Sequence, residues 1–136
     1  SQVFADMSSA IKADRPAFFG SFFDNFFGTG DKEVPVSQEM RDWCAQIALQ
    51  GNLKSTIACI DSFATTDFRP DLVAMTTPTL VIHGDADQIV PIDASARVLA
   101  KELPEAQLIE YAGGPHGLFA THKQELTRDL LKFLNS

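Results

Sequence analysis

The chain has 136 residues, 45% of them hydrophobic, which is enough apolar material for one globular domain with a packed core. Its formal charge of -7 at pH 7 repels phosphate backbones and anionic lipid head groups, so nucleic acid and membrane surfaces are not expected partners. Cys44 and Cys59 lie in helical patterns and no secretory leader precedes them, so we expect a cytoplasmic protein without structural disulfides.

The first half of the chain shows only helical periodicity. Apolar residues recur at helical spacing from Val3 to Ile11, and a second helix is predicted to begin near Pro16, because proline is tolerated in a first turn. That helix carries two interleaved four-residue series, Phe18, Phe22 and Phe26 and then Phe19, Phe23 and Phe27. Ser37 is the expected N-cap of a third helix, and a fourth follows Gly51. We therefore expect a cluster of helices.

Strands and helices alternate in the second half. Residues 79–83 and 108–111 are short apolar runs bounded by turn residues, so both are predicted strands. A helix capped by Asp93 is expected between them, and a final amphipathic helix after the second strand. Two strands joined by a helix predict a parallel pair with a right-handed crossover. The chain thus divides into a helical segment, residues 1–66, and a βαβα segment, residues 67–136.

Two loops that follow the predicted strands carry reactive side chains. The loop at 83–91 contains Asp85 and Asp87, and the loop at 113–117 contains His116. The carboxyl ends of neighbouring parallel strands meet at one edge of a sheet, so we expect the carboxylates and the imidazole to lie close together. A carboxylate that orients a histidine base is the arrangement this pattern predicts.

Three stretches, in this order, are similar to a known family: 66–72 (TDFRPDL), 77–91 (TPTLVIHGDADQIVP) and 112–118 (AGGPHGL). They resemble the C-terminal half of the α/β-hydrolases, closest to the cofactor-free haloperoxidase and aryl-esterase branch with its γ-lactamase relatives. The resemblance implies an α/β fold, a three-layer αβα sandwich when complete. In that fold residues 1–66 would form a helical lid, and residues 67–136 the last two parallel strands with their helices.

The resemblance assigns the triad acid to Asp87, in the family's Gly-x-x-Asp pattern from Gly84, and the triad base to His116. Asp85 is the alternative acid, and either aspartate could simply cap a turn. For His116 the alternative is a solvated loop histidine, although the flanking glycines and proline favour a tightly placed loop. His83 and His122 are expected to be structural.

A cofactor or metal is not expected. His83, Asp85, Asp87 and His116 are all potential ligands, but the loop lacks the ligand series of an EF-hand and no paired-histidine helix motif occurs. The resemblance implies chemistry that needs neither a metal nor an organic group.

The nucleophile of such an enzyme is missing from this sequence. A nucleophile elbow requires Gly-x-Ser-x-Gly, and no serine here has glycine two positions before and two after. In these hydrolases the triad follows the order Ser, Asp, His, so we expect a C-terminal piece that is inactive alone. Because two strands are too few to stand alone, the missing N-terminal half, or self-association, is the expected partner.

The resemblance implies a serine hydrolase of the carboxylesterase or non-heme chloroperoxidase type. Its substrate would be a small ester, amide or carboxylic acid, and attack of peroxide on the acyl-enzyme would yield a peracid that oxidises halide. Substrate-pocket candidates are Phe18, Phe22, Trp43 and Leu118, although aromatic residues at helical spacing usually belong to the core. The alternative function is a non-catalytic binding or assembly module derived from a hydrolase.

Overall fold

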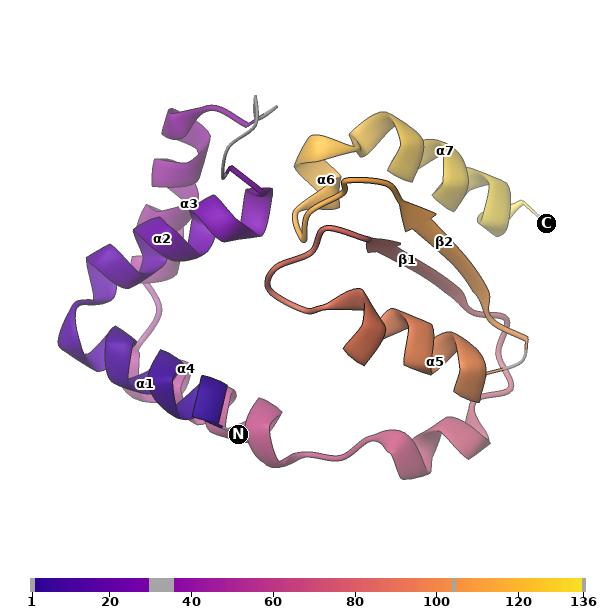
Figure 1. Ribbon diagram of the computed structural model, residues 1–136, viewed down its shortest axis with the longest axis horizontal. Coiled ribbons are helices and arrows are strands. Elements are labelled where there is room, and N and C mark those ends of the chain that lie inside the picture. Colours follow the sequence, from indigo (N-terminus) through magenta and orange to yellow (C-terminus); the bar gives the residue numbers. More distant parts are fainter. Residues whose placement is uncertain (1, 30–35, 104, 136) are drawn as a thin grey trace. The chain divides into compact units, whose positions relative to one another are not determined.

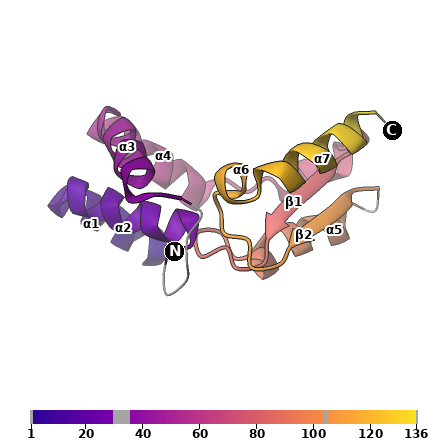
Figure 2. The same cartoon turned by 90° about the horizontal axis from the view of Figure 1, so that it is seen from above.

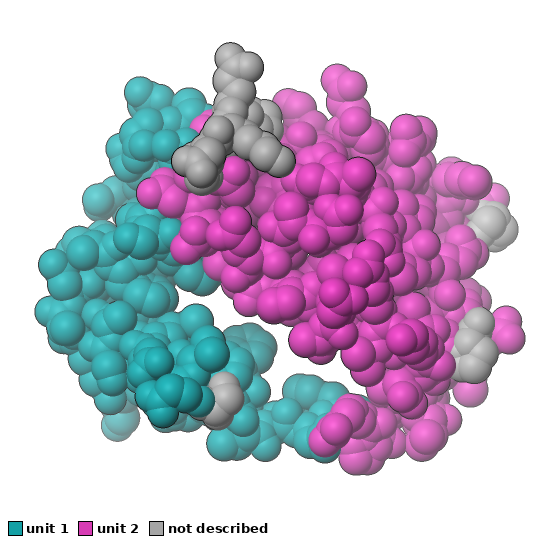
Figure 3. Space-filling model, in the orientation of Figure 1, with its two compact units in different colours: residues 1–23, 37–68 teal, residues 24–36, 69–136 magenta. Residues whose placement is uncertain are grey.

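A computed structural model describes residues 2–29, 36–103 and 105–135 (Figure 1). The chain forms two compact units, one of residues 1–23 and 37–68 and the other of residues 24–36 and 69–136 (Figure 3). The division differs from a single boundary at residue 66, because residues 24–36 belong to the unit that contains the strands. The role of residues 1–66 as a lid stays a prediction.

Among the residues described in the first half of the chain there are four helices: α1 (Gln2–Ala13), α2 (Arg15–Phe27), α3 (Gln38–Leu49) and α4 (Leu53–Thr65). Side-chain caps set three of the starts. Asp14 accepts a hydrogen bond from the backbone N–H of Ala17, and Ser37, the predicted N-cap, accepts one from Met40. Asn52 caps α4 in the same way. Local sequence therefore determines where these helices begin.

The helical unit, residues 1–23 and 37–68, packs around Ile11, Phe19 and Ile60, all of which are buried. Arg15 joins α2 to the turn between α3 and α4, because its Nη2 donates to the carbonyl oxygen of Gly51 over 2.6 Å. The same guanidinium lies 5.7 Å from the centre of the Phe19 ring. One arginine thus supports the junction of three helices.

The second unit contains two parallel strands, β1 (Leu80–Gly84) and β2 (Gln107–Tyr111), both within one residue or two of their predicted bounds. Leu80 lies opposite Gln107 at one end of the pair and Gly84 opposite Tyr111 at the other. Among the described residues the sheet has these two strands only.

The described part of residues 69–136 also contains two 3₁₀ helices and three α-helices: Arg69–Ala74, Ile92–Ala94, α5 (Ala96–Glu102), α6 (Leu118–Thr121) and α7 (Lys123–Leu134). Asp93 was expected to cap α5, but it lies within the second 3₁₀ helix, and Ser95 precedes the α-helix. The single final helix that the sequence predicts is divided at His122 into α6 and α7.

Helices α5 and α7 cover opposite faces of the strand pair (Figures 1 and 2). Neighbouring residues of a strand point to opposite faces. Glu110 of β2 pairs with Arg97 of α5, whereas the next residue, Tyr111, donates its hydroxyl proton to Asp129 of α7 over 2.8 Å. The two interactions fix one helix on each side, as a three-layer α/β fold requires.

None of the helices in the described residues is both long enough and apolar enough to span a bilayer.

Candidate active site

The loops after β1 and β2 are bound together by their main chains. Asp85 N donates to Tyr111 O over 3.1 Å, and Ala86 N donates to Gly114 O over 3.0 Å. A Cβ atom added to Gly84 would lie 2.0 Å from Gly114 O, so only glycine permits this approach. The sequence Gly-x-x-Asp therefore has a steric reason for its glycine at the start of the loop.

Asp85 forms a second connection between the loops. Its Oδ1 accepts a hydrogen bond of 2.6 Å from the backbone N–H of Gly113, which has a φ of 70°. Glycine adopts this left-handed conformation without strain. Asp85, the alternative acid, thus bonds the turn that precedes His116, and it is Asp87 whose carboxylate reaches the imidazole.

Asp87 is a buried carboxylate whose two oxygens both accept hydrogen bonds. Its side chain is 2% exposed, and Oδ2 lies 2.7 Å from Nδ1 of His116. Oδ1 accepts from the backbone N–H groups of Ile89 and Val90 over 2.8 and 2.9 Å. These backbone donors satisfy a buried polar side chain and hold the carboxylate in position.

His116 faces Asp87 with one ring nitrogen and remains partly open, with 33% of its side chain exposed. An ionised carboxylate only accepts, so the proton of this hydrogen bond belongs to Nδ1. Nε2 is then the unprotonated nitrogen of the neutral ring. This is the tautomer that a general base requires.

The end of α2 supports the His116 loop. The Phe26 ring packs edge-on against the imidazole, with ring centres 4.8 Å apart, and Phe26 O accepts from Gly117 N over 2.8 Å. A Cβ atom on Gly117 would lie 2.5 Å from a ring carbon of Phe27, which is fully buried. Sequence reasoning missed Phe26, because its helical spacing placed it in the same stripe as the other phenylalanines.

His83, the last side chain of β1 before Gly84, also lies at this site. Its Nε2 is 2.9 Å from Val90 O and 3.1 Å from Oδ2 of Asp87. The sequence pattern marked this histidine as structural because it occupies a strand position. Its spacing of four residues from Asp87 was the one signal that could have related the two side chains.

The substrate-pocket candidates lie in both units. Phe18 and Phe22 belong to the helical unit and stack on each other, with ring centres 5.9 Å apart, and Trp43 of α3 is 60% exposed. Leu118 belongs to the strand-containing unit, where it is buried beside Gly114. Their assignment to a pocket stays a prediction from the resemblance.

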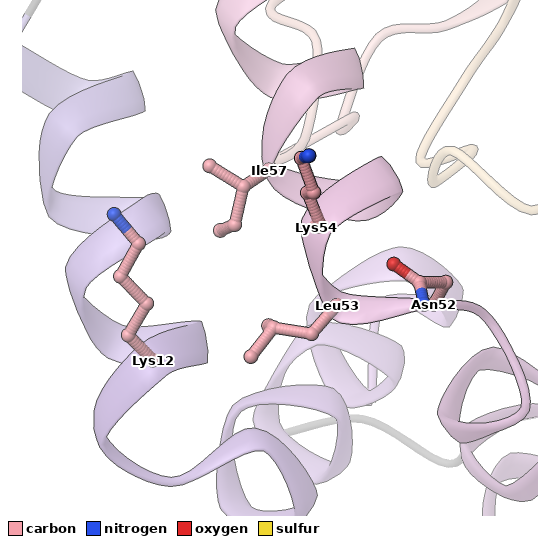
Figure 4. A pocket seen from close by; sticks show the side chains of 5 residues that line it. All are labelled: Lys12, Asn52, Leu53, Lys54 and Ile57. Carbon is pink, nitrogen blue, oxygen red and sulfur yellow. The ribbon is translucent and has the colours of Figure 1, made fainter.

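A pocket lies within the helical unit (Figure 4). It has a volume of about 500 Å³, and Lys12 of α1 faces Leu53 and Ile57 of α4 across it. Asn52 and Lys54 complete the lining, which contains neither a carboxylate nor an imidazole. In the part of the chain that the structure describes, no three histidine, cysteine or acidic side chains are grouped to hold a metal ion.

A buried carboxylate is thus hydrogen-bonded to Nδ1 of a histidine, on loops that follow adjacent parallel strands. The chain belongs to the α/β-hydrolase family, since the family model described as alpha/beta hydrolase fold matches residues 11–123.

Relatives of this chain include haloperoxidases and an esterase. It is 36% identical to the non-heme chloroperoxidase CPO-A1 of Kitasatospora aureofaciens, over 98% of this chain and 50% of that protein. The bifunctional esterase/perhydrolase DCH of Acinetobacter calcoaceticus is 31% identical, over 99% of this chain and 49% of its own length. The crystal structure of a bromoperoxidase from Bacillus anthracis superposes with a TM-score of 0.93 at 39% identity, covering 98% of this chain and 48% of that one.

The resemblance to the haloperoxidase and esterase branch is therefore confirmed. The chain spans about half the length of the relatives it matches, which fits the predicted C-terminal half of the fold.

Proposed function

We propose that this chain supplies the acid and the base of a serine hydrolase that cleaves small esters or amides by acyl transfer. The observation that carries the proposal is the 2.7 Å hydrogen bond between Oδ2 of Asp87 and Nδ1 of His116. The family membership supports the reaction class. The serine would come from the N-terminal half of the fold, because no serine of this sequence has the flanking glycines of an elbow.

In this proposal Nε2 of His116 takes the proton of the serine hydroxyl as its oxygen attacks the substrate carbonyl carbon. The imidazolium then donates that proton to the leaving alcohol or amine as the scissile bond breaks, and the acyl-enzyme remains. A water molecule repeats the two steps and releases the acid. Asp87 keeps the imidazole in the required tautomer and stabilises its positive charge, which is the task that its burial and backbone donors suit.

Perhydrolysis is the finer proposal for the same site. Hydrogen peroxide would attack the acyl-enzyme in place of water, His116 would accept its proton, and the peracid would leave as the ester bond to serine breaks. The peracid then transfers one oxygen atom to halide, which gives hypohalite and returns the carboxylic acid. The names of the relatives, a chloroperoxidase and an esterase/perhydrolase, support this route. It requires no metal or organic cofactor.

We further propose that the strand-containing unit is completed by the N-terminal half or by a second copy of the chain. Parallel sheets are normally covered on both faces and contain more than two strands. On α7 the side chains of Leu130, Leu131 and Leu134 are exposed, as is Phe119 of α6. Additional strands beside β1 would widen the sheet, and these exposed apolar side chains of α6 and α7 would then pack against the added strands.

The test is active-site labelling of the complete protein with a fluorophosphonate, together with turnover of an activated phenyl ester. We expect one labelled serine outside the present sequence, no label within it, and loss of turnover in the His116→Ala variant. A complete protein that neither takes the label nor hydrolyses esters would instead support the alternative function, a binding or assembly module derived from a hydrolase.

A further inference from the structure

We propose that His83 is a positioning residue that shares the Asp87 carboxylate with His116 and thereby tunes the hydrogen bond between the acid and the base. This inference rests on the proposed function, since it assigns a role within the same acid–base pair. Asp87 then has two histidine neighbours: His83 belongs to β1, and His116 lies in the loop that follows β2.

The hydrogen-bond geometry around His83 determines which atom carries the proton. A carbonyl oxygen only accepts, so the 2.9 Å contact with Val90 O requires a proton on Nε2 of His83. The same nitrogen lies 3.1 Å from Oδ2 of Asp87, the oxygen that receives the Nδ1 proton of His116. The N–H group of His83 is thus bonded to a backbone carbonyl, and its nitrogen lies beside the Asp87 carboxylate without a hydrogen bond to it.

These contacts connect the two ends of the loop that carries Asp87. Val90 donates its N–H to Oδ1 of Asp87 and offers its carbonyl oxygen to His83, while Oδ2 of Asp87 faces the same His83 nitrogen. His83 is held by β1 and only 15% of its side chain is exposed. The carboxylate therefore lies beside a polar N–H group that is fixed by the sheet, in addition to the donors of its own loop.

The electrostatic effect of His83 on one oxygen provides the tuning. Charge-assisted hydrogen bonds shorten and strengthen as the acceptor becomes more negative. The polar N–H group of His83, with its nitrogen 3.1 Å from Oδ2, offsets part of the negative charge there, so His116 receives a weaker hydrogen bond than an isolated carboxylate would give. Glu110, the cross-strand neighbour of His83, is paired with Arg97.

Two substitutions separate tuning from simple core packing. In His83→Gln the side-chain amide nitrogen lies four bonds from Cα, as Nε2 of histidine does, so the variant keeps an N–H at the same reach without a titrating ring. His83→Leu fills the space and removes the donor. His83→Asn remains polar but is one bond too short, so it serves if the leucine variant does not fold.

The readout is the NMR resonance of the His116 Nδ1 proton in the complete, folded protein. We expect the leucine and asparagine variants to shift this resonance downfield and the glutamine variant to leave it in place. His122→Gln is the matched control, because His122 is a partly buried histidine bonded to Thr121 and stacked on Tyr111. Ester turnover is the second readout: kcat should change in the leucine variant with KM unchanged, and it should return to the unmodified value in the glutamine variant.

An unchanged resonance in both donor-free variants would overturn the role of His83, as would an equal shift in the glutamine variant. The resonance exists whether or not the protein hydrolyses esters. A protein without esterase activity that nevertheless shows the expected shifts would refute the proposed function and leave the coupling between His83, Asp87 and His116 established.

Discussion

Replacement of Asp87 by asparagine probes the central interaction of the candidate site. Oδ1 receives two backbone N–H groups, so an asparagine would keep its carbonyl oxygen there, because its NH₂ group would face two donors. The NH₂ group must then face His116, where it donates to Nδ1 and drives the imidazole proton to Nε2. Nε2 of His83, which lies 3.1 Å from Oδ2, would then be beside a second N–H donor.

The expected loss is large because the wrong tautomer cannot accept the serine proton. In a serine protease triad the same exchange of acid for amide lowers kcat by about 10⁴, which corresponds to about 5 kcal/mol of transition-state stabilisation. The assay is steady-state hydrolysis of an activated phenyl ester by the complete enzyme, with circular dichroism to verify folding. KM should change much less than kcat.

Asp85→Asn is the matched control on the same loop. Its carbonyl oxygen can still accept the hydrogen bond from Gly113 N, so turnover should stay within about threefold of the unmodified enzyme, an effect of about 0.5 kcal/mol. A larger loss for Asp85→Asn than for Asp87→Asn would transfer the acid role to Asp85 and refute the tautomer argument.

Four further outcomes are expected. Gly84→Ala would place Cβ 2.0 Å from Gly114 O and should lower the free energy of unfolding by about 1–3 kcal/mol. In Gly113→Ala the new Cβ meets no atom within 4 Å, so only the positive φ destabilises this variant. Equal urea midpoints for the two variants would contradict this ranking. Burial, and then the hydrogen bond to Asp129, raise the pKa of Tyr111 to about 12, so the folded state holds this proton more tightly than the unfolded chain, whose tyrosine has a pKa of about 10. The stability that Tyr111 contributes should be fully present below pH 10 and be lost between about pH 10 and about pH 12. Urea midpoints measured across this pH range should show the loss, and Tyr111→Phe should remove it. Halide oxidation by the complete enzyme in peroxide should require a short carboxylic acid and survive EDTA; activity lost in EDTA and restored by one metal would rule out the cofactor-free route. Sedimentation of the isolated chain should show self-association, and a sharply melting monomer at micromolar concentration would show that it needs no partner.

The strands and the meeting of the two loops could be predicted from sequence. Residues 79–83 combine a continuous apolar run with a turn at Gly84, and parallel pairing then brings the ends of β1 and β2 to one edge. The contact between Asp87 and His116 follows from this topology together with the two glycine-bounded loops. Their catalytic roles stay predictions.

Contacts that depend on tertiary packing could not be predicted. Helical periodicity gives Phe26 the same pattern as Phe22, and only the position of the His116 loop distinguishes the two rings. The late start of α5 at Ala96 had no clear signal, because Asp93 is a suitable cap by composition but its carboxylate pairs with Arg97. The strand pattern around His83 does not show that its Nε2 lies 3.1 Å from Oδ2 of Asp87.

The close crossing of Gly84 and Gly114 has a consequence for redesign of this protein. The separation of the two loops is set by backbone atoms in direct contact, together with the N–H of Ala86 and the carbonyl oxygen of Gly114. Side-chain exchanges in the helical unit change none of these atoms. Libraries that vary the apolar residues of α3 and α4 can therefore explore large changes in side-chain volume, while Asp87 and His116 keep their spacing.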